Sequence, residues 1–436
     1  MMFAALRTAI AARGGIADWM ITETIKNGSE RYYIGTKTDM SRSVESRDYR
    51  LTLYVDDERD GSRFRGEASA SIHPTMSAQE LATAVDRAAF AASMSRNPWY
   101  ELPEPRPALV TVPASRFEGT SPASGMNALA EALFSAKDGR SRINSLELFL
   151  SRIERRVINS CGVDAGWTVW SGYTEYTIES SGKNGAVELT DDFRFSDPDY
   201  ERLTTEVTAA LEAVTARADA EPTPTLFEAP LVLPRKHATE TLGWFMINLT
   251  SPRIFARSSP LALEESVHGP EARPGGYDPL ELIAEPAIRG SPLSAPFDGE
   301  GSPLGRAVCT ERGVAKTIVG PSRYAQYLGI PALGDHRLFS VGPGSRSPES
   351  LRSGPHLEVV YFSDFVLDSD SGDFGGEIRL AWYSDGTSRR PVSGGSVSGA
   401  MMENRALLRY SNRIEANGSM NGPEAVLLPR VSVAGA

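Results

Sequence analysis

The feature that most constrains the fold is a set of alternating polar and apolar stretches joined by short turn sequences. Residues 50–55 and 64–72 alternate, and Asp60-Gly61, a pair that tolerates positive φ angles, lies between them. Residues 167–178 and 185–195 alternate in the same way, and the turn sequence 182–185 separates them. This pattern predicts antiparallel hairpins, and no repeat of the dinucleotide-binding βαβ type accompanies it. Further strands are expected over 19–25, 31–35 and 146–158.

Helical patterns flank these strands. Ser77 and Glu80 have the spacing of a capping box, which predicts a helix over 78–94. A second long helix is predicted over 200–218, where apolar residues recur three or four positions apart. Shorter helices are expected over 3–12 and 126–135. The predicted fold class is therefore α+β, with helix-flanked antiparallel sheets in the N-terminal half.

Composition divides the chain into three segments. Residues 1–105 form a predicted N-terminal α+β domain that ends in a proline-rich linker, and residues 108–225 form a predicted middle α+β region. Residues 226–436 are rich in Gly, Pro and Ser, and we expect a large β-rich C-terminal domain there. Its predicted strands are 357–367, 377–383, 406–410 and 426–433.

Charge and cysteine content exclude several classes of protein. The 45 basic and 56 acidic residues give a net charge of −11, which argues against a nucleic-acid-binding surface. No apolar run approaches the roughly 18 residues that cross a bilayer, and Arg7 and Arg13 interrupt any signal-peptide pattern. Two distant cysteines, Cys161 and Cys309, favour a reducing compartment. We expect a cytoplasmic protein with no membrane or nucleic-acid partner.

The five histidines provide no obvious catalytic zinc site. Such a site needs three protein ligands, commonly including two His on one helical face, and no His here has another within five residues. Glu264 and His268 are four positions apart, but Gly269-Pro270 follows at once, so an exposed loop or helix end is favoured. His237 precedes the predicted helix 238–246 and is interpreted as a residue that caps it.

Two further patterns are weaker. Asp368, Asp370 and Gly372 resemble the start of a calcium loop, with Asp364 and Asp373 nearby, but the twelfth position is Arg379 instead of Glu, and a solvated turn is favoured. Ser180 and Lys183 match a nucleophile pattern formally, at a place where a hairpin turn is needed. The residues alone therefore indicate no internal catalytic constellation.

The third segment contains several motifs that point to a known family. The stretch 295–303 reads Ala-Pro-Phe-Asp-Gly-Glu-Gly-Ser-Pro, and Ala325 and Gly329 follow it. This stretch resembles the FDxEGxP passage of the TldD/PmbA family, in which an Ala and a Gly also follow. The stretches 341–344, 370–374 and 386–399 resemble later family passages in the same order. The resemblance marks possible peptide-cleft or family-motif residues, which are Phe297, Asp298, Glu300, Gly301, Gly372, Asp373 and Phe374.

The resemblance implies metallopeptidase function and a two-subunit organisation. Family members are described as modulators of DNA gyrase and as peptidases, and a TldD-type subunit with a His-Glu-x-x-x-His zinc motif and a distal Cys pairs with a TldE/PmbA-type subunit that lacks them. Here the comparable place has His237 without a following Glu, and Leu242 or Gly243 stands where a second His would be. Cys309 also lies too early for the distal Cys. The implied identity is a zinc-free subunit whose catalytic partner carries the zinc.

Three hypotheses follow from these observations. The first is a non-catalytic TldE/PmbA-like subunit, with no cofactor of its own, that acts with a TldD-like partner on unstructured peptides. A pair formed with a second copy of the chain stays open. The second hypothesis is a self-sufficient metallopeptidase with divergent ligands such as His237 and His268. The third is a protein that binds peptides without hydrolysing them.

Overall fold

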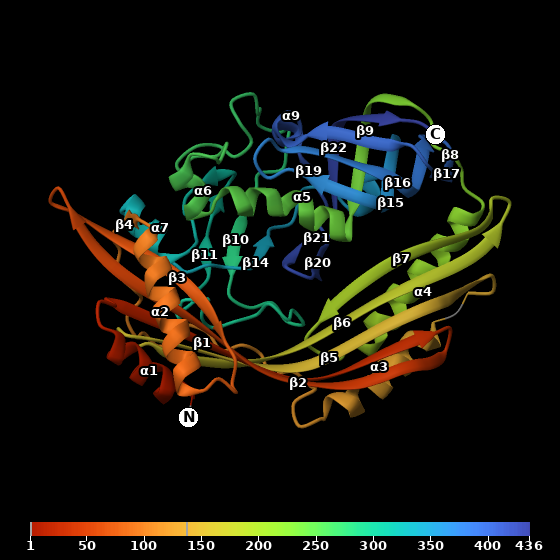
Figure 1. Cartoon of the computed structure of the whole chain (residues 1–436). Helices are drawn as coiled ribbons and strands as arrows, with labels where there is room; N and C mark the ends of the chain where they lie inside the picture. The colour runs from red at the N-terminus through yellow and green to blue at the C-terminus, as the bar shows by residue number, and fades with distance from the viewer. Residues whose placement is uncertain (1, 137) are drawn as a thin grey trace.

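The computed structural model describes residues 2–136 and 138–436 in two parts (Figure 1). A long, curved sheet with helices forms the N-terminal part, and a β-rich part lies against it. The chain contains both helices and long antiparallel sheets, so the predicted α+β class is confirmed.

One sheet contains the strands of the N-terminal half. In the described residues its seven strands have the order β4-β3-β2-β1-β5-β6-β7, and all neighbours are antiparallel. The segments 1–105 and 108–225 therefore share a sheet through the β1–β5 ladder, and the domain boundary between them stays a prediction. The strands are β1 Asp18–Ile34, β2 Lys37–Arg59, β3 Ser62–Ile72, β4 Asn97–Pro98, β5 Ser141–Asn159, β6 Asp164–Gly182 and β7 Gly185–Phe195.

Both predicted hairpins are present. Strands β2 and β3 pair across Asp60-Gly61, whose φ angles are 50° and 74°, and β6 and β7 pair from Gly182 to Gly185. The predicted division of residues 19–35 into two strands is wrong, because β1 is continuous. Gly28 in its middle lies against β5, where a Cβ would be only 2.3 Å from the Ser151 Oγ, so this glycine serves a close approach.

Two pairs of helices cover the sheet. Helices α1 (Met2–Arg13) and α2 (Ala78–Met94) pack on Ile21, Leu51 and Leu53, while α3 (Pro122–Ser135) and α4 (Tyr200–Ala218) pack on Leu148 and Ile178. The bounds predicted for α2 and α4 are confirmed, and the Ser77–Glu80 capping box is formed.

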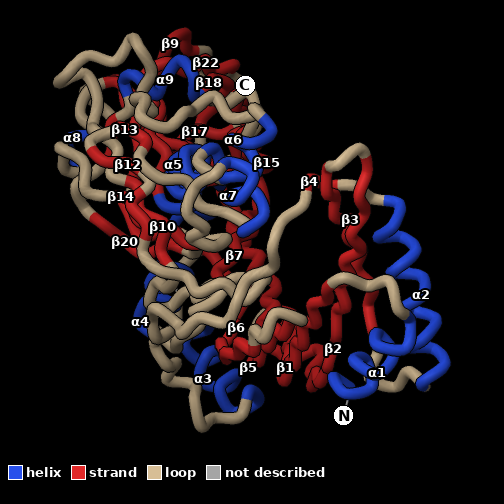
Figure 2. Tube along the Cα trace, turned by 90° about the vertical axis from the view of Figure 1, so that its left-hand side faces the viewer, coloured by secondary structure: helices blue, strands red, loops and turns tan. Residues whose placement is uncertain are grey.

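The C-terminal half builds its sheets from strands that are distant in the sequence (Figure 2). Strand β9 lies between β15 and β22, and β15 also pairs with β16, so the larger sheet closes on itself. Helix α5 (Arg235–Asn248) contributes Leu242 and Phe245 to the core of this half. The larger sheet contains β8 Glu221–Pro222, β9 Leu226–Pro234, β15 Pro355–Leu367, β16 Asp373–Asp385, β17 Arg389–Ser393, β18 Ser396–Ala400, β19 Arg409–Tyr410 and β22 Ala425–Ala434.

A five-stranded sheet, a short hairpin and several short helices complete this half in the described residues. The sheet has β10 Leu282–Glu285, β11 Ala307–Val308, β14 Leu338–Val341, β20 Ile414–Asn417 and β21 Met420–Pro423, and the hairpin has β12 Thr310–Glu311 and β13 Val314–Ala315. The helices are α5 Arg235–Asn248, α6 Ser251–Ala256, α7 Ser322–Leu328, α8 Pro348–Leu351, α9 Met401–Asn404 and the 3-10 helix Arg405–Leu407.

One predicted strand of this half is wrong. Residues 406–410 form the end of the 3-10 helix and the two-residue strand β19. The ladder to β22 is limited to Arg409 and Tyr410, and the Tyr410 amide donates to the buried Asp278 carboxylate at 2.9 Å. The strands predicted over 357–367, 377–383 and 426–433 are confirmed within β15, β16 and β22.

Helix α7 joins the C-terminal half to the outer end of the N-terminal sheet. Arg323 pairs with Glu67 of β3 at 2.5 Å, and the Tyr327 hydroxyl donates to the Pro98 carbonyl at 2.6 Å. Gln326 exchanges two hydrogen bonds with the Glu101 backbone. Within the described chain, no helix is long and apolar enough to cross a membrane.

Candidate functional site

His237 lies in the first turn of α5, at the position where the resemblance implies a zinc ligand. Its Nδ1 is 3.1 Å from the Glu240 Oε2, and its ring packs edge-on against Phe362 and Phe365 at centroid distances of 4.8 and 5.3 Å. The prediction that His237 caps the helix is wrong. Pro234 occupies the cap position, and His237 instead pairs with a carboxylate one turn further on.

The neighbouring positions of α5 face the core. Ala238 and Leu242 are both 0% exposed and pack in the main cluster of the C-terminal half. A methyl group and an isobutyl group donate no lone pair to a metal, so the first turns of α5 offer one imidazole. The backbone has the helical geometry that the implied motif needs, but the side chains do not supply its ligands.

His268 has a structural role. Its Nδ1 donates to the Arg405 carbonyl at 2.8 Å, and its Nε2 accepts from the Leu280 amide at 3.1 Å. Because burial disfavours the imidazolium, the pKa of His268 is lowered to about 4. The predicted exposed loop is therefore wrong at this residue, which is fully buried. Both ring nitrogens are engaged, so the geometry does not bring His237 and His268 together as metal ligands.

Other donors do not compensate. Among residues 2–136 and 138–436, no three His, Cys, Asp or Glu side chains lie close enough together to hold a metal ion. Cys309 is buried, and burial raises its thiol pKa to about 11, while Cys161 lies exposed beside Asp18. The residues present do not fit a zinc centre of the implied kind, and we derive no chemistry through zinc in this chain.

Asp298, from the first family motif, folds its own loop. Its Oδ1 accepts hydrogen bonds from the amides of Glu300 and Ser302, both at 2.9 Å, and its Oδ2 accepts from the Asp335 amide at 3.1 Å. The carboxyl group is buried, and burial raises its pKa against the lowering effect of these donors. Asp298 thus ties the loop 298–302 to the distant segment at Asp335.

The rest of this motif attaches the loop to the N-terminal sheet. Gly301 has a φ of 85°, and a Cβ there would lie 2.5 Å from a methyl of Val163 at the β5–β6 turn. The Phe297 ring lies 6.4 Å from the Trp167 ring of β6. Glu300 accepts from the Ser322 amide at the start of α7, and burial, helped by the Asp298 charge, raises its pKa to about 7. The motif is a connection between the two halves.

The second motif forms a turn beside α5. The Asp368 carboxylate accepts from the amides of Asp370 and Ser371 at 2.8 and 2.7 Å, and Asp370 pairs with Arg253. Gly372 has a φ of 78°, and its carbonyl accepts from the Met401 amide at 2.7 Å. Residues 368–371 therefore form an exposed turn, which is the structure that the sequence favours over a calcium loop.

The remaining second-motif residues separate into buried and exposed positions. Phe374 is buried against Gly399 and lies 6.2 Å from Phe365, whereas the Asp373 side chain is exposed. Asp364 is also exposed, and Lys183 lies in the hairpin turn after Ser180, whose hydroxyl bonds to the Arg140 carbonyl. In the described chain no hydrogen bond joins the first motif to the second, and neither lines the cavities found below.

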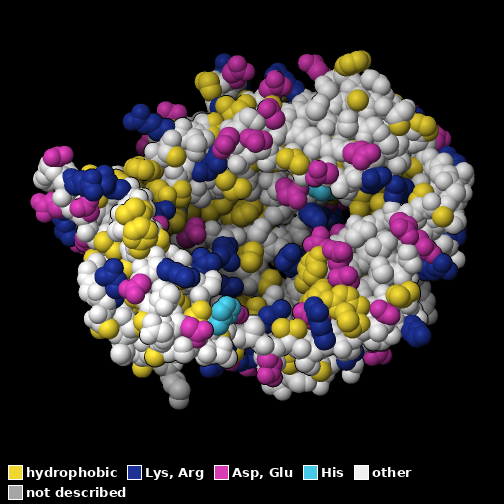
Figure 3. Space-filling model, viewed as in Figure 1, with side chains coloured by type: hydrophobic (Ala, Val, Ile, Leu, Met, Phe, Trp, Pro, Cys, Tyr) yellow, Lys and Arg dark blue, Asp and Glu magenta, His cyan; other side chains and the backbone are white. Residues whose placement is uncertain are grey.

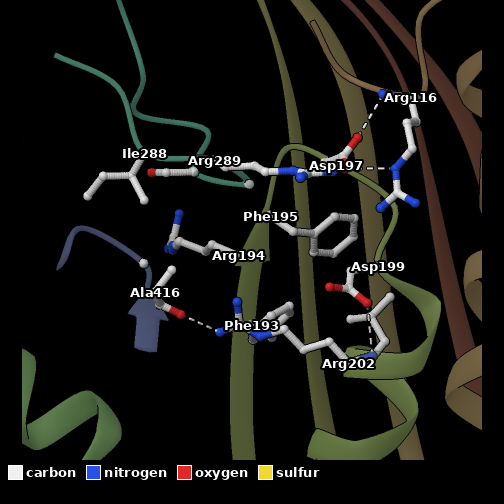
Figure 4. Close-up of a pocket in the computed structure, with 14 residues that line it drawn as sticks. Arg116, Phe193, Arg194, Phe195, Asp197, Asp199, Arg202, Ile288, Arg289 and Ala416 are labelled. Atoms are coloured by element: carbon white, nitrogen blue, oxygen red, sulfur yellow. Dashed lines mark hydrogen bonds and ion pairs between the residues drawn. The ribbon is translucent and has the colours of Figure 1, made fainter. Parts of the chain in front are cut away.

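A concave site lies elsewhere, where the end of β7, the start of α4 and the loop 288–291 meet (Figure 4). The cavity has a volume of about 250 Å³. Four arginines and two aspartates come to it from separate parts of the chain, namely Arg116, Arg194, Arg202, Arg289, Asp197 and Asp199. No sequence signal identifies this site, because its arginines are widely spaced and form no motif.

A second cavity of about 330 Å³ shares the loop 288–291. It extends along β6 from Thr168 to Trp170, on the strand stretch that β7 leaves unpaired. The space-filling view shows the molecule hollowed between its two halves, with charged side chains of both signs around the hollow (Figure 3). Arg289 thus lies on a loop shared by two recesses.

Comparison with known proteins identifies the C-terminal half. Residues 228–435 match the PmbA/TldA metallopeptidase C-terminal domain. No curated protein sequence is detectably similar to the chain.

Solved structures with this fold match nearly the whole chain. TldE from Thermococcus kodakarensis has a TM-score of 0.78 at 18% identity, over 99% of each chain. A candidate DNA gyrase modulator from Thermotoga maritima has a TM-score of 0.77 at 15% identity, over 99% of this chain and 100% of the other. One from Bacteroides thetaiotaomicron has a TM-score of 0.75 at 17% identity, over 100% and 99%. Residues 228–435 belong to the PmbA/TldD C-terminal domain family, and the motifs and the fold of the whole chain agree with that family.

Proposed function

We propose that the chain is a non-catalytic, TldE/PmbA-like subunit of a zinc metallopeptidase that processes unstructured peptides. Its catalytic partner would be a TldD-like chain that contributes the His-Glu-x-x-x-His helix and the zinc. The chain shares its fold with a protein named TldE, at 18% identity. We expect the pair to work in the cytoplasm.

The proposal rests on the side chains that α5 has at the positions of the implied zinc motif. Ala238 and Leu242 stand at the positions of the implied Glu and second His, and both are buried in the core. His237 pairs with Glu240, and His268 uses both ring nitrogens for backbone contacts. A catalytic zinc with three protein ligands needs donors that this helix lacks.

The proposed subunit would act by restricting access to the active site of its catalytic partner. Its curved sheet and hollowed face could wall off the partner's active site, which would admit extended peptides and exclude folded proteins. Extended peptides often bind by adding a strand to a free sheet edge, and the stretch of β6 that β7 leaves unpaired offers such an edge.

Reconstitution tests the proposal. The chain is purified alone, and again with a co-expressed TldD-type homologue, and both samples are assayed for hydrolysis of an unstructured fluorogenic peptide and for zinc by mass spectrometry. We expect the chain alone to bind substoichiometric zinc and to be inactive, and the mixture to cleave peptide and to lose activity to a chelator.

The same experiment separates the alternatives. About one zinc per chain together with chelator-sensitive hydrolysis by the isolated chain would establish a self-sufficient metallopeptidase. Tight peptide binding without any product, with or without the homologue, would instead establish a peptide-binding protein. A matched His237→Ala variant separates them further, because it should abolish activity only in a self-sufficient enzyme.

A further inference from the structure

We propose that the arginine-lined cavity of Figure 4 binds the C-terminal carboxylate of a short peptide, an inference that rests on the proposed function and names a substrate feature that it leaves open. Planar guanidinium groups match carboxylate oxygens in pairs, so a recess lined by arginines is suited to this ligand. The residues assigned to the carboxylate are Arg194 of β7 and Arg289 of the loop 288–291.

The side chains that line the cavity have a net positive charge, whereas the whole chain has a net negative charge. The whole molecule has a net charge of −11, yet four arginines and two aspartates line this recess. Local excess of one sign in a recess concentrates ligands of the opposite sign. The cavity should therefore attract anions although the protein as a whole repels them.

Both aspartates are already engaged. Asp197 accepts from the Arg116 amide at 2.7 Å and from the Arg116 Nε at 2.9 Å. Asp199 caps α4 by accepting from the Arg202 amide at 3.1 Å. Arg202 in turn donates to the Ala416 carbonyl at 2.8 Å.

Arg194 and Arg289 are the two guanidinium groups left for a ligand. Within residues 2–136 and 138–436, neither has a carboxylate within ion-pair distance. Arg194 lies over the Tyr173 ring, with its Cζ 4.7 Å from the centroid, a contact that positions the group without neutralising it. The loop 288–291, which carries Arg289, is held against the end of β7, because the Ser196 amide donates to the Gly290 carbonyl at 2.8 Å.

Apolar surface next to the arginines favours a peptide over a bare anion. Phe193, Phe195 and Ile288 line the same cavity and could contact a hydrocarbon side chain. Beyond Arg194, half-buried rings continue across the sheet, because Tyr173 of β6 lies 5.8 Å from Phe149 of β5, which lies 5.7 Å from Tyr32 of β1. Neighbouring strands are about 4.8 Å apart, so these rings offer a path for the residues that precede the carboxylate.

Binding to the isolated chain tests this assignment. An N-terminally fluorescein-labelled Gly-Ser-Ala-Phe peptide with a free C-terminus is titrated by fluorescence anisotropy against the same peptide with a C-terminal amide. We expect the free acid to bind on the order of tenfold more tightly, since a charge-assisted pair is lost in the amide. Arg194→Gln and Arg289→Gln should each remove most of this preference, and the double variant all of it.

Controls keep the result specific. Arg87→Gln removes an exposed arginine of α2, outside the cavity, and should leave the preference unchanged. Circular dichroism and thermal melting of each variant establish that it is folded. Inorganic phosphate, added as a competitor and titrated alone by calorimetry, distinguishes a free anion from a peptide end.

Three outcomes would overturn the proposal. Equal binding of acid and amide peptides, or an unchanged preference in the folded double variant, contradicts a carboxylate site at these arginines. Arginine-dependent phosphate binding with no binding of the acid peptide contradicts the peptide source. Because nothing is hydrolysed in this assay, its failure is distinguishable from failure of the subunit assignment, which depends on zinc content and reconstituted activity.

Discussion

The two halves of the molecule obtain their order in different ways. In the N-terminal sheet, β1, β2 and β3 are neighbours in both sequence and space, as are β5, β6 and β7. In the C-terminal half, β9 pairs with β22 and β15, which lie more than a hundred residues further along the chain. Local pairing closes short loops, whereas distant pairing has a larger entropic cost and gains more from fixed anchors.

Buried polar side chains supply such anchors in the C-terminal half. Asp298, His268 and Asn404 each join backbone segments that are far apart in the sequence, and each is buried. The N-terminal half combines helix caps and apolar contacts between sheet and helices with a buried ion pair of Arg65 with Asp18 and Asp56. Removing one buried polar contact and one helix cap therefore tests whether the two halves depend on different interactions.

The largest effect is expected from Asp298→Ala. The substitution leaves three amide donors without their buried acceptor, which should lower the free energy of unfolding by about 3 kcal/mol. Urea denaturation measures the loss, and hydrogen exchange should locate it in the C-terminal half. Asp368→Ala, which removes a similar turn at the surface, is the matched control, and an equally small effect of both would refute the anchor role.

A pH-dependent effect is expected at Glu300, on the connection between the halves. Its folded-state pKa of about 7 exceeds the ordinary value of 4.5, so the folded protein holds this proton more tightly than the unfolded chain. Stability from this group should therefore fall as the pH rises from about 4.5 to 7, by on the order of 2 kcal/mol.

The measurement for Glu300 compares urea midpoints across this pH range. Glu300→Gln keeps an acceptor for the Ser322 amide but does not titrate, so the difference between wild type and variant should change with pH in this window. A constant difference from pH 4.5 to 8 would contradict the raised pKa.

A smaller effect is expected from Glu67→Gln, which weakens the ion pair between β3 and α7. Arg323 would face a neutral amide, and the loss should be about 1 kcal/mol because both side chains are partly exposed. Hydrogen exchange at residues 97–102 should accelerate, because Tyr100 also bonds to Glu67. Arg413→Gln, at an exposed ion pair of the C-terminal half, serves for comparison and should leave that segment unchanged.

The smallest change in stability is expected from the N-cap of helix α2 in the N-terminal half. Ser77→Ala removes the cap of α2 and should cost about 1 kcal/mol or less. Exchange should accelerate in the first turn of α2 and remain unchanged in the C-terminal half. Ser77→Asp, which restores a capping oxygen, should recover most of the loss, and faster exchange around Asp298 would contradict the separation of the two halves.

Local sequence signals predict the N-terminal half well. The capping residues delimit α2, the proline and turn residues delimit α4 and β7, and the structure agrees with the predicted bounds of all three. Residues 406–410 have a strand-like composition, but only Arg409 and Tyr410 pair with β22, and the Tyr410 amide bonds to the distant Asp278, a partner that a local pattern does not identify. His237 was misplaced for a similar reason, since its Glu240 contact becomes visible only on the helix.

The candidate site divides in the same way. The motif around Asp298 is visible in the sequence, but its role as a connection depends on Val163 and Asp335, which no spacing identifies. The arginine-lined cavity leaves no sequence signal, because Arg194 and Arg289 are brought together by the packing of one half on the other. The absence of neighbouring histidines, in contrast, can be read directly from the sequence.

Helix α7 has a consequence for chimaeras made between relatives. Arg323, Gln326 and Tyr327 lie on one face of this helix, and each contacts a different part of the N-terminal half, at Glu67, Glu101 and Pro98. A recombination point between residues 101 and 323 would separate all three pairs of contacting residues at once. Exchanges between family members should therefore transfer α7 together with residues 67–101, and compensating substitutions should accumulate across this seam.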